Sequence, residues 1–166
     1  MIKISVCDDD EGQLTFFKQC FMEYNEKHKE KIEANFYQSV QSLLNEKKFS
    51  PDVYFLDIEL QDGNGLKLAG KIRTRNSKIP IVFITSHEEF MPEAFHVHAY
   101  QYLNEKKNAQ AVENVLNQLA DYFSEQNQIF SFQTYGEMIS LDCRDIICFT
   151  SEKRKNIVIA ESGEFE

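Results

Sequence analysis

Five short apolar segments alternate with amphipathic segments over residues 1–125, and this alternation most restricts the folds open to the chain. The apolar segments are rich in Ile, Val, Phe and Tyr, which favour strands. A regular order of strands and helices is typical of a parallel sheet covered by helices on both faces. We therefore predict an α/β fold with a doubly wound, five-stranded parallel sheet. The predicted strands are residues 2–7, 32–37, 53–60, 79–85 and 99–103.

The segments between these strands carry apolar side chains at the spacing of one helix face. Ser39 is a candidate N-cap for the second helix, and Asn108 for the last. A Gly-Asn-Gly turn at residues 63–65 leads into the third helix. The residues that define the five helix faces are Leu14, Phe17, Phe21 and Tyr24; Val40, Leu43 and Leu44; Leu66, Ala69 and Ile72; Phe90, Ala94 and Phe95; and Val112, Val115, Leu116 and Leu119.

The pattern changes near residues 124–128. Residues 128–149 and 157–160 are predicted to form short strands, with turns at Tyr135-Gly136 and around Arg144. About 40 residues are too few for a robust independent core. We predict a first domain over residues 1–125 and an incomplete β-rich second domain over residues 126–166.

Composition excludes several classes of protein. The net charge of −9 disfavours a broad nucleic-acid-binding surface. No apolar run is long enough to span a bilayer, and the N-terminus lacks a signal peptide, so we expect a cytoplasmic protein without membrane contact. The four cysteines lack C-x-x-C spacing, and we expect them to be reduced and mostly buried.

Acidic residues follow two of the predicted strands. Asp8, Asp9 and Asp10 follow the first strand, and Asp57 lies near the end of the third. The carboxyl ends of parallel strands form the ligand-binding edge of such a sheet. Clustered carboxylates repel one another, and a hard divalent cation such as Mg²⁺ relieves this. Asp57 is then placed to attack phosphorus and form an acyl phosphate, while the metal neutralises charge on the phosphoryl oxygens.

A simpler interpretation makes the Asp-Asp-Asp run an acidic turn and Asp57 a helix-cap or loop residue. Either feature alone favours that interpretation. Their occurrence at successive strand ends, with Thr85-Ser86 after the fourth strand, favours the site.

The order of these motifs resembles the receiver domain of two-component response regulators. The resemblance rests on the acidic pair, Asp57, the turn at residues 62–65, the Thr85-Ser86 step and Tyr102. It implies a flavodoxin-like sheet of order 2-1-3-4-5 and phosphorylation of Asp57 by a sensor histidine kinase. It further implies that Thr85 moves toward the phosphate and that Tyr102 changes rotamer with it. The implied Mg²⁺ ligands are Asp8, Asp9, Asp57 and the backbone carbonyl of Glu59.

One position departs from that family. The family has a lysine three residues after the switch aromatic, usually followed by proline, whereas this chain has Glu105 and then Lys106. Either Glu105 adds repulsion near the phosphate, or a local shift brings Lys106 into the lysine's role. We favour Lys106 slightly.

Residues 129–166 resemble the opening strands of a LytTR-type DNA-binding domain. Lys153, Arg154 and Lys155 form the one dense basic cluster in an acidic chain, on a predicted loop between strands. The resemblance implies that this cluster contacts phosphates and that Asn156 reaches a base edge of promoter DNA in the complete protein. Without the resemblance, a solvated hairpin tip is the better interpretation.

The sequence therefore predicts a phosphorylation-dependent transcription regulator of the LytTR class, not an enzyme, which forms a homodimer on activation. Two alternatives stay open. Glu105 favours a pseudo-receiver that binds proteins without phosphorylation. A Mg²⁺-dependent phosphohydrolase needs a second acid, a position that Glu59 fills only loosely.

Overall fold

A computed structural model of the chain describes all residues except 86–87, 104–106, 127–128, 135, 153–154 and 166. Its contacts divide the chain into two compact units, Met1–Leu116 and Asn117–Glu166. Helix α5 (Ala109–Gln126) runs across that division. The predicted boundary near residues 124–128 falls at the end of this helix, whereas the second compact unit begins within it, at Asn117.

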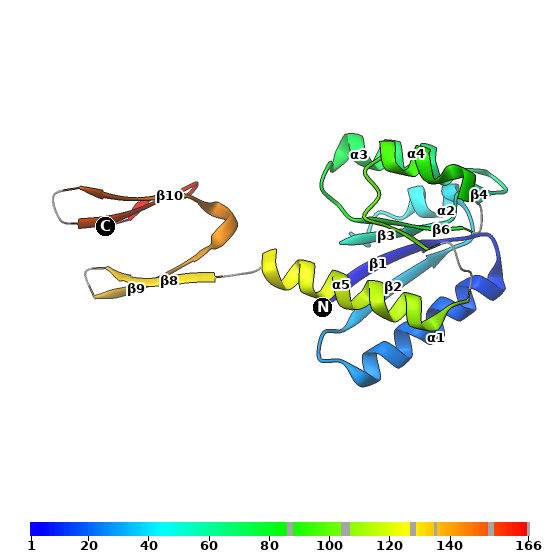
Figure 1. The fold of residues 1–166 in the computed structure, drawn as a ribbon, viewed down its shortest axis with the longest axis horizontal. Coiled ribbons are helices and arrows are strands. Elements are labelled where there is room, and N and C mark those ends of the chain that lie inside the picture. Colours follow the sequence, from blue (N-terminus) through cyan, green and yellow to red (C-terminus); the bar gives the residue numbers. More distant parts are fainter. Residues whose placement is uncertain (86–87, 104–106, 127–128, 135, 153–154, 166) are drawn as a thin grey trace. The chain divides into compact units, whose positions relative to one another are not determined.

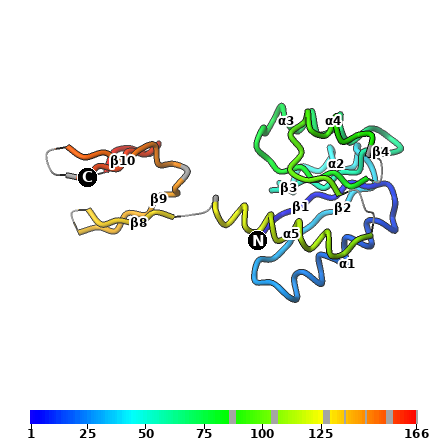
Figure 2. The backbone as a smooth tube through the Cα atoms, in the orientation of Figure 1, coloured from blue at the N-terminus to red at the C-terminus, as the bar shows by residue number. Residues whose placement is uncertain are grey.

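The first unit is built on a parallel sheet of five strands in the order β2-β1-β3-β6-β7. Counting only these five strands, this is the predicted order 2-1-3-4-5, and the prediction is confirmed. Figure 2 shows the first strand, in blue, in the interior of the sheet. The strands are β1 (Ile2–Cys7), β2 (Ile32–Tyr37), β3 (Val53–Leu56), β6 (Ile81–Ile84) and β7 (Gln101–Leu103).

Helices cover both faces of the sheet (Figure 1). α1 (Glu11–Lys27) and α5 lie on one face. α2 (Val40–Asn45), α3 (Gly65–Arg75) and α4 (Met91–His96), which the short helix Glu88–Phe90 precedes, lie on the other.

Side-chain oxygens cap the helix starts as the sequence predicts. Ser39 accepts a hydrogen bond from the Ser42 amide, and Asn108 accepts one from the Ala111 amide. Each bond satisfies a backbone donor that has no partner within its own helix, which fixes where the helix begins.

The core on the α1 face is aromatic. The Phe55 ring on β3 meets the Phe17 and Phe21 rings of α1 edge-on, with centroids 5.9 and 5.8 Å apart. Phe17 and Phe55 are fully buried. Because the central strands are covered on both faces, nearly all their residues are apolar, and this accounts for the strong strand signal in the sequence.

One predicted strand is wrong in its second half. Residues 53–60 were predicted as a single strand, but β3 ends at Leu56. Glu59–Leu60 forms a separate short strand, β4, which pairs antiparallel with β5 (Gly63–Asn64). The apolar residues Ile58 and Leu60 are buried under the other helix layer, so they look like a strand continuation in the sequence although the chain has turned.

The second unit contains a hairpin and a three-stranded antiparallel sheet. Phe130 of the hairpin contacts Phe149 of the sheet at 5.1 Å between ring centroids, and Phe132 contacts Phe165 at 6.1 Å. Phe149 nevertheless remains 61% exposed, so this aromatic cluster is open to solvent on one side. The elements are β8 (Ile129–Thr134), β9 (Glu137–Asp142), the short helix Cys143–Asp145, β10 (Ile146–Glu152), β11 (Lys155–Ala160) and β12 (Gly163–Phe165).

The cysteines are free thiols, but only two of the four are buried. Cys7 and Cys20 lie in the core, whereas Cys143 and Cys148 are exposed, so the expectation of mostly buried thiols is wrong for the second unit. Burial raises the pKa of Cys7 to about 12, with a further contribution from nearby carboxylates, and raises the pKa of Cys20 to about 11.

Replacing Phe55 by alanine should lower the free energy of unfolding by about 3–5 kcal/mol, because it opens a cavity between two α1 rings. Urea unfolding followed by circular dichroism measures this. Phe95 is 81% exposed, and Phe95→Ala should change stability by no more than about 0.5 kcal/mol. Equal losses in the two variants would contradict the packing described above.

Alkylation with iodoacetamide at pH 8 should modify Cys143 and Cys148 well before Cys7 and Cys20. The thiolate is the reactive form, and the raised pKa of each buried thiol suppresses it while burial blocks access. Peptide mass spectrometry over a time course gives the order of modification. Early modification of Cys7 in the folded protein is the contrary result.

Candidate functional site

Strand register brings Asp8 and Asp57 together. Cys7, the last residue of β1, is paired with Leu56, the last residue of β3. The next residue on each strand is an aspartate, and the Asp57 amide still donates to the Cys7 carbonyl at 2.8 Å. Asp8 is fully buried and Asp57 is 2% exposed. The sheet therefore fixes both carboxylates at its carboxyl edge.

Backbone amides orient the three carboxylates. One oxygen of Asp8 accepts from the Asp10 amide at 2.8 Å, and one oxygen of Asp57 accepts from the Ile58 amide at 2.8 Å. Asp9, which is half-buried, accepts from the Gln61 amide at 3.0 Å. Each carboxylate is thus held in a fixed rotation.

Asp8, Asp9 and Asp57 each offer an oxygen within 4.8 Å of the others'. No other such group of potential metal ligands occurs among the residues that the structure describes. Three carboxylates at this separation suit a hard, oxygen-coordinated cation, since Mg²⁺ typically takes one or two carboxylates and keeps several waters. The donor set therefore fits the predicted Mg²⁺.

The third aspartate of the run has a different role. Asp10 is the N-cap of α1, and its side chain accepts from the Gly12 and Gln13 amides at 2.7 and 3.2 Å. Asp10 therefore belongs to the start of α1, while its two neighbours belong to the acidic cluster.

Asp62 caps α2, whereas the sequence placed it only in a turn. Its two carboxylate oxygens accept from the Val40 and Gln41 amides, each at 2.9 Å, at the start of α2. These bonds, that from Gln41 foremost, lower the pKa of Asp62. Because Gln61 donates to Asp9, the β4–β5 hairpin connects the acidic cluster to α2. An aspartate 22 residues from a helix start gives no sequence signal of this cap.

Thr85 and Tyr102 lie on neighbouring strands. Thr85 follows β6 directly, is fully buried, and its amide donates to the Leu103 carbonyl at 3.0 Å. Tyr102 is half-buried on β7, paired with Phe83. The predicted hydroxyl and aromatic residues are therefore adjacent in the sheet.

Glu59 and Lys106 are the remaining predicted residues of the acidic edge. Glu59 begins β4 with an exposed side chain, which leaves only its backbone for the predicted metal contact. Lys106 lies outside the described residues, as does Glu105, so the choice between them stays a prediction. The next residue, Lys107, adopts a left-handed conformation with φ of 65°. Its Nζ lies 3.7 Å from the position of a Cβ built on Gly12, a placement near the acidic edge that the sequence analysis missed.

The predicted DNA-contacting residues lie around the β10–β11 connection. Lys153 and Arg154 are outside the described residues, as is the side chain of Lys155. Asn156 is exposed, but it lies within β11, paired with Ser151, and not on a loop. β11 already begins at Lys155, so the loop is shorter than predicted.

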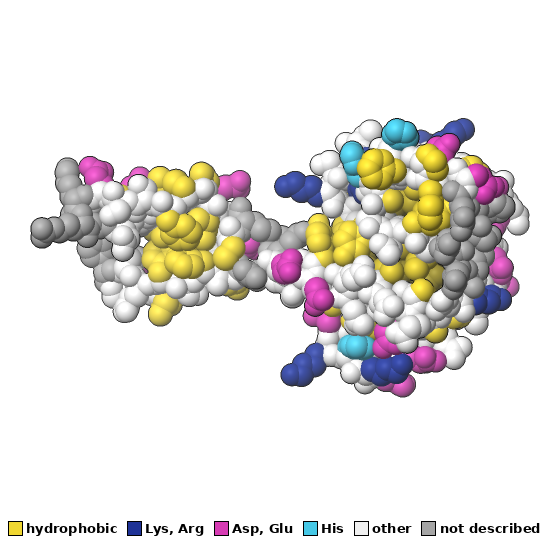
Figure 3. Space-filling view, in the orientation of Figure 1, with side chains coloured by type: hydrophobic (Ala, Val, Ile, Leu, Met, Phe, Trp, Pro, Cys, Tyr) yellow, Lys and Arg dark blue, Asp and Glu magenta, His cyan; other side chains and the backbone are white. Residues whose placement is uncertain are grey.

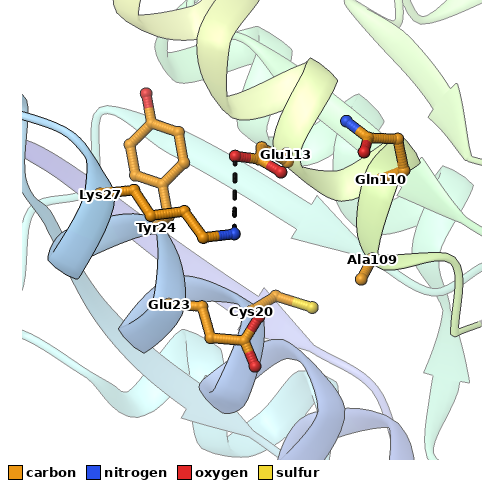
Figure 4. A pocket seen from close by; sticks show the side chains of 7 residues that line it. All are labelled: Cys20, Glu23, Tyr24, Lys27, Ala109, Gln110 and Glu113. Atoms are coloured by element: carbon orange, nitrogen blue, oxygen red, sulfur yellow. Dashed lines mark ion pairs between the residues drawn. The ribbon is translucent and has the colours of Figure 1, made fainter.

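A cavity of about 190 Å³ lies between α1 and α5 (Figure 4). Lys27 Nζ lies 3.9 Å from Glu113 Oε1 across it, and His28 Nε2 lies 3.2 Å from the same oxygen. The partly exposed Lys27–Glu113 pair contributes about 0.2–1 kcal/mol, and both contacts join the two helices. The cavity follows the second half of α1, whereas the acidic cluster precedes its first turn. The lining residues are Cys20, Glu23, Tyr24, Lys27, Ala109, Gln110 and Glu113.

Comparison with known proteins gives one family match and several curated relatives. Residues 4–117 match the response regulator receiver domain. The chain is 32% identical over 111 residues to the sensory transduction protein LytR of Staphylococcus haemolyticus, covering 67% of this chain and 42% of that protein. It is 29% identical over 120 residues to a response regulatory protein of Yersinia pestis, covering 72% of this chain and 49% of that protein. The chain thus spans about half the length of these relatives or less.

Solved structures show the same fold. A CheY-like receiver domain from Methanospirillum hungatei has a TM-score of 0.64 at 18% identity, covering 75% of this chain and 98% of that one. The response regulator TrrA of Thermotoga maritima, in complex with Mg²⁺ and BeF, has a TM-score of 0.61 at 22% identity, covering 72% and 99%. Separately, no helix within the described ranges is both long and apolar enough to cross a membrane.

Gly65 should tolerate no side chain. A Cβ there would lie 2.0 Å from the Asp57 carbonyl oxygen, so Gly65→Ala must displace the backbone of the acidic cluster. We expect a loss of about 1–3 kcal/mol in the free energy of unfolding and weaker Mg²⁺ binding, measured by urea unfolding and calorimetry.

Gly70→Ala is the matched control in the same helix, because nothing lies within 4 Å of its added Cβ. It should stabilise the protein by about 0.5–1 kcal/mol through helix propensity, with Mg²⁺ binding unchanged. Similar effects of the two substitutions would rule out close approach at Gly65.

Proposed function

Because this chain belongs to the response regulator receiver domain family, we propose that it accepts a phosphoryl group on Asp57 from a sensor histidine kinase. One observation carries the proposal: the Asp57 carboxylate is buried at the carboxyl edge of the sheet with Asp8 and Asp9 within 4.8 Å. Like charges at this separation are costly without a compensating cation. A divalent metal and a phosphoryl donor together account for the arrangement.

Asp57 is the nucleophile in this proposal. An oxygen of its carboxylate attacks phosphorus, the bond from phosphorus to the donor imidazole breaks, and an acyl phosphate forms on Asp57. The Ile58 amide, which donates to Asp57 Oδ1 at 2.8 Å, fixes the rotation of the carboxylate for this attack.

Asp8, Asp9 and Asp57, with the Glu59 carbonyl, are the residues that would hold Mg²⁺. The bound metal supplies charge neutralisation at the phosphoryl oxygens. Lys106, or in its place Glu105, determines whether a protein cation adds to that effect. The TrrA structure, which contains Mg²⁺ and BeF, supports a metal at this kind of site.

The response would pass from Thr85 to the α4 surface. Thr85 and Tyr102 lie on adjacent strands, so movement of the Thr85 hydroxyl toward a phosphate changes the space available to the Tyr102 ring. On α4, Phe95 is 81% and Met91 44% exposed, and Figure 3 shows hydrophobic side chains on this face. We propose that phosphorylation favours homodimer formation through that surface.

The second unit would serve as the start of a LytTR-type DNA-binding domain in a cytoplasmic transcription regulator. The likeness to LytR supports this role. In the complete protein, Lys153, Arg154 and Lys155 would contact DNA phosphates, and the exposed Asn156 a base edge of the promoter. We propose that each molecule accepts one phosphoryl group, on Asp57, and does not turn over substrate continuously. On this proposal the protein is not an enzyme.

The test is intact-mass spectrometry after incubation with acetyl phosphate, with and without Mg²⁺. Wild type should gain one phosphoryl group only with Mg²⁺, and Asp57→Asn should gain none. Asp10→Asn is the matched control, because Asp10 caps α1 and should leave phosphorylation intact.

Failure of folded wild type to gain mass would instead favour the pseudo-receiver alternative, with Glu105 in place of the lysine. Continuous release of phosphate from a phosphomonoester would favour the phosphohydrolase.

A further inference from the structure

Gln13 carries a buried polar side chain that the packing of α1 does not explain. It is fully buried on α1, yet neither its amide nitrogen nor its amide oxygen has a hydrogen-bond partner among the residues that the structure describes. Buried polar groups are paired in the great majority of cases, and an unpaired one is destabilising. An apolar residue of similar shape would fill this position without that cost.

From the packing of α1 on β3 we infer that Gln13 lies near Asp57. The contact between Phe17 of α1 and Phe55 of β3, with ring centroids 5.9 Å apart, gives the alignment of the helix with the strand. Gln13 lies four residues before Phe17, about 6 Å nearer the start of α1. Asp57 lies two residues after Phe55, directly beyond the end of β3, and its amide still donates to the Cys7 carbonyl at 2.8 Å, so it lies about 6.6 Å further in the direction of the strand. Because α1 runs back along parallel strands, both steps go toward the carboxyl edge of the sheet.

Two further features fix this placement. The Asp10 carboxylate accepts from the backbone amide of Gln13, so the first turn of α1 is held directly beside the acidic run. Side chains on a helix lean toward its N-terminus, which directs the Gln13 side chain to the edge where Asp8 and Asp57 lie.

We propose that Gln13 donates an amide hydrogen bond to the phosphoryl group carried by Asp57. This inference rests on the proposed phosphorylation of Asp57. A phosphoryl group brings three strong acceptor oxygens toward a side-chain amide that has no hydrogen-bond partner among the described residues. Gln13 therefore destabilises the unphosphorylated receiver slightly and stabilises the phosphorylated one, which favours the active state on both counts.

Gln13→Met removes the amide and keeps an unbranched side chain. Thermal unfolding of the 166-residue chain should occur at a higher temperature in this variant than in wild type when no ligand is present. With Mg²⁺ present, its apparent affinity for beryllofluoride, taken from the shift in unfolding temperature, should be about tenfold weaker, the effect of one hydrogen bond to a charged group. The acyl phosphate formed with acetyl phosphate should also have a several-fold shorter half-life.

Gln19→Met is the matched control, since Gln19 lies on the exposed side of the same helix and bonds Glu23 at 3.0 Å. It should behave as wild type in all three measurements. Gln13→Leu serves as a second variant if the methionine packs poorly.

The outcomes separate the two proposals. A Gln13→Met protein that unfolds at a higher temperature but binds beryllofluoride and keeps its phosphoryl group as wild type does would overturn the role of Gln13 while leaving phosphorylation intact. Wild type that neither gains phosphoryl mass nor responds to beryllofluoride would overturn the proposed function itself.

Discussion

The pairing of β1 with β3 is the constraint on which the rest of the first unit depends. Because Cys7 is opposite Leu56, the two strands deliver Asp8 and Asp57 to the same point, and both carboxylates are buried. A shift of one residue in this register would send one of them to the opposite face of the sheet. The aromatic contacts of Phe55 with α1 hold β3 in place, so packing in the interior determines the geometry of the acidic cluster.

Most of this architecture could be predicted from the sequence, because buried parallel strands are nearly all apolar and their helices are amphipathic. The positions of Asp8, Asp57 and Thr85 at strand ends could also be predicted, since polar residues at the ends of apolar runs stand out. Helix caps at Ser39 and Asn108 were equally visible, because a cap is a local pattern.

Features that depend on distant residues could not be predicted. The break after Leu56 is hidden because Ile58 and Leu60 are buried after the turn as they would be in a strand. Two features arise only in the folded chain. Gly65 lies against the Asp57 carbonyl, and the side-chain amide of Gln13 has no hydrogen-bond partner among the described residues. Cys143 and Cys148 are exposed because they lie in the second unit, where even the aromatic cluster is open to solvent.

The β4–β5 hairpin connects α2 to the acidic cluster. The two residues of the hairpin turn point to different partners: the Gln61 amide donates to Asp9, and Asp62 caps α2. Coupling between two sites is reciprocal: if a cation at the acidic cluster tightens the hairpin, then stabilising α2 must raise the affinity for that cation by the same factor. Under that condition, a six-residue helix that is marginal alone would be coupled thermodynamically to a cation bound at the acidic cluster.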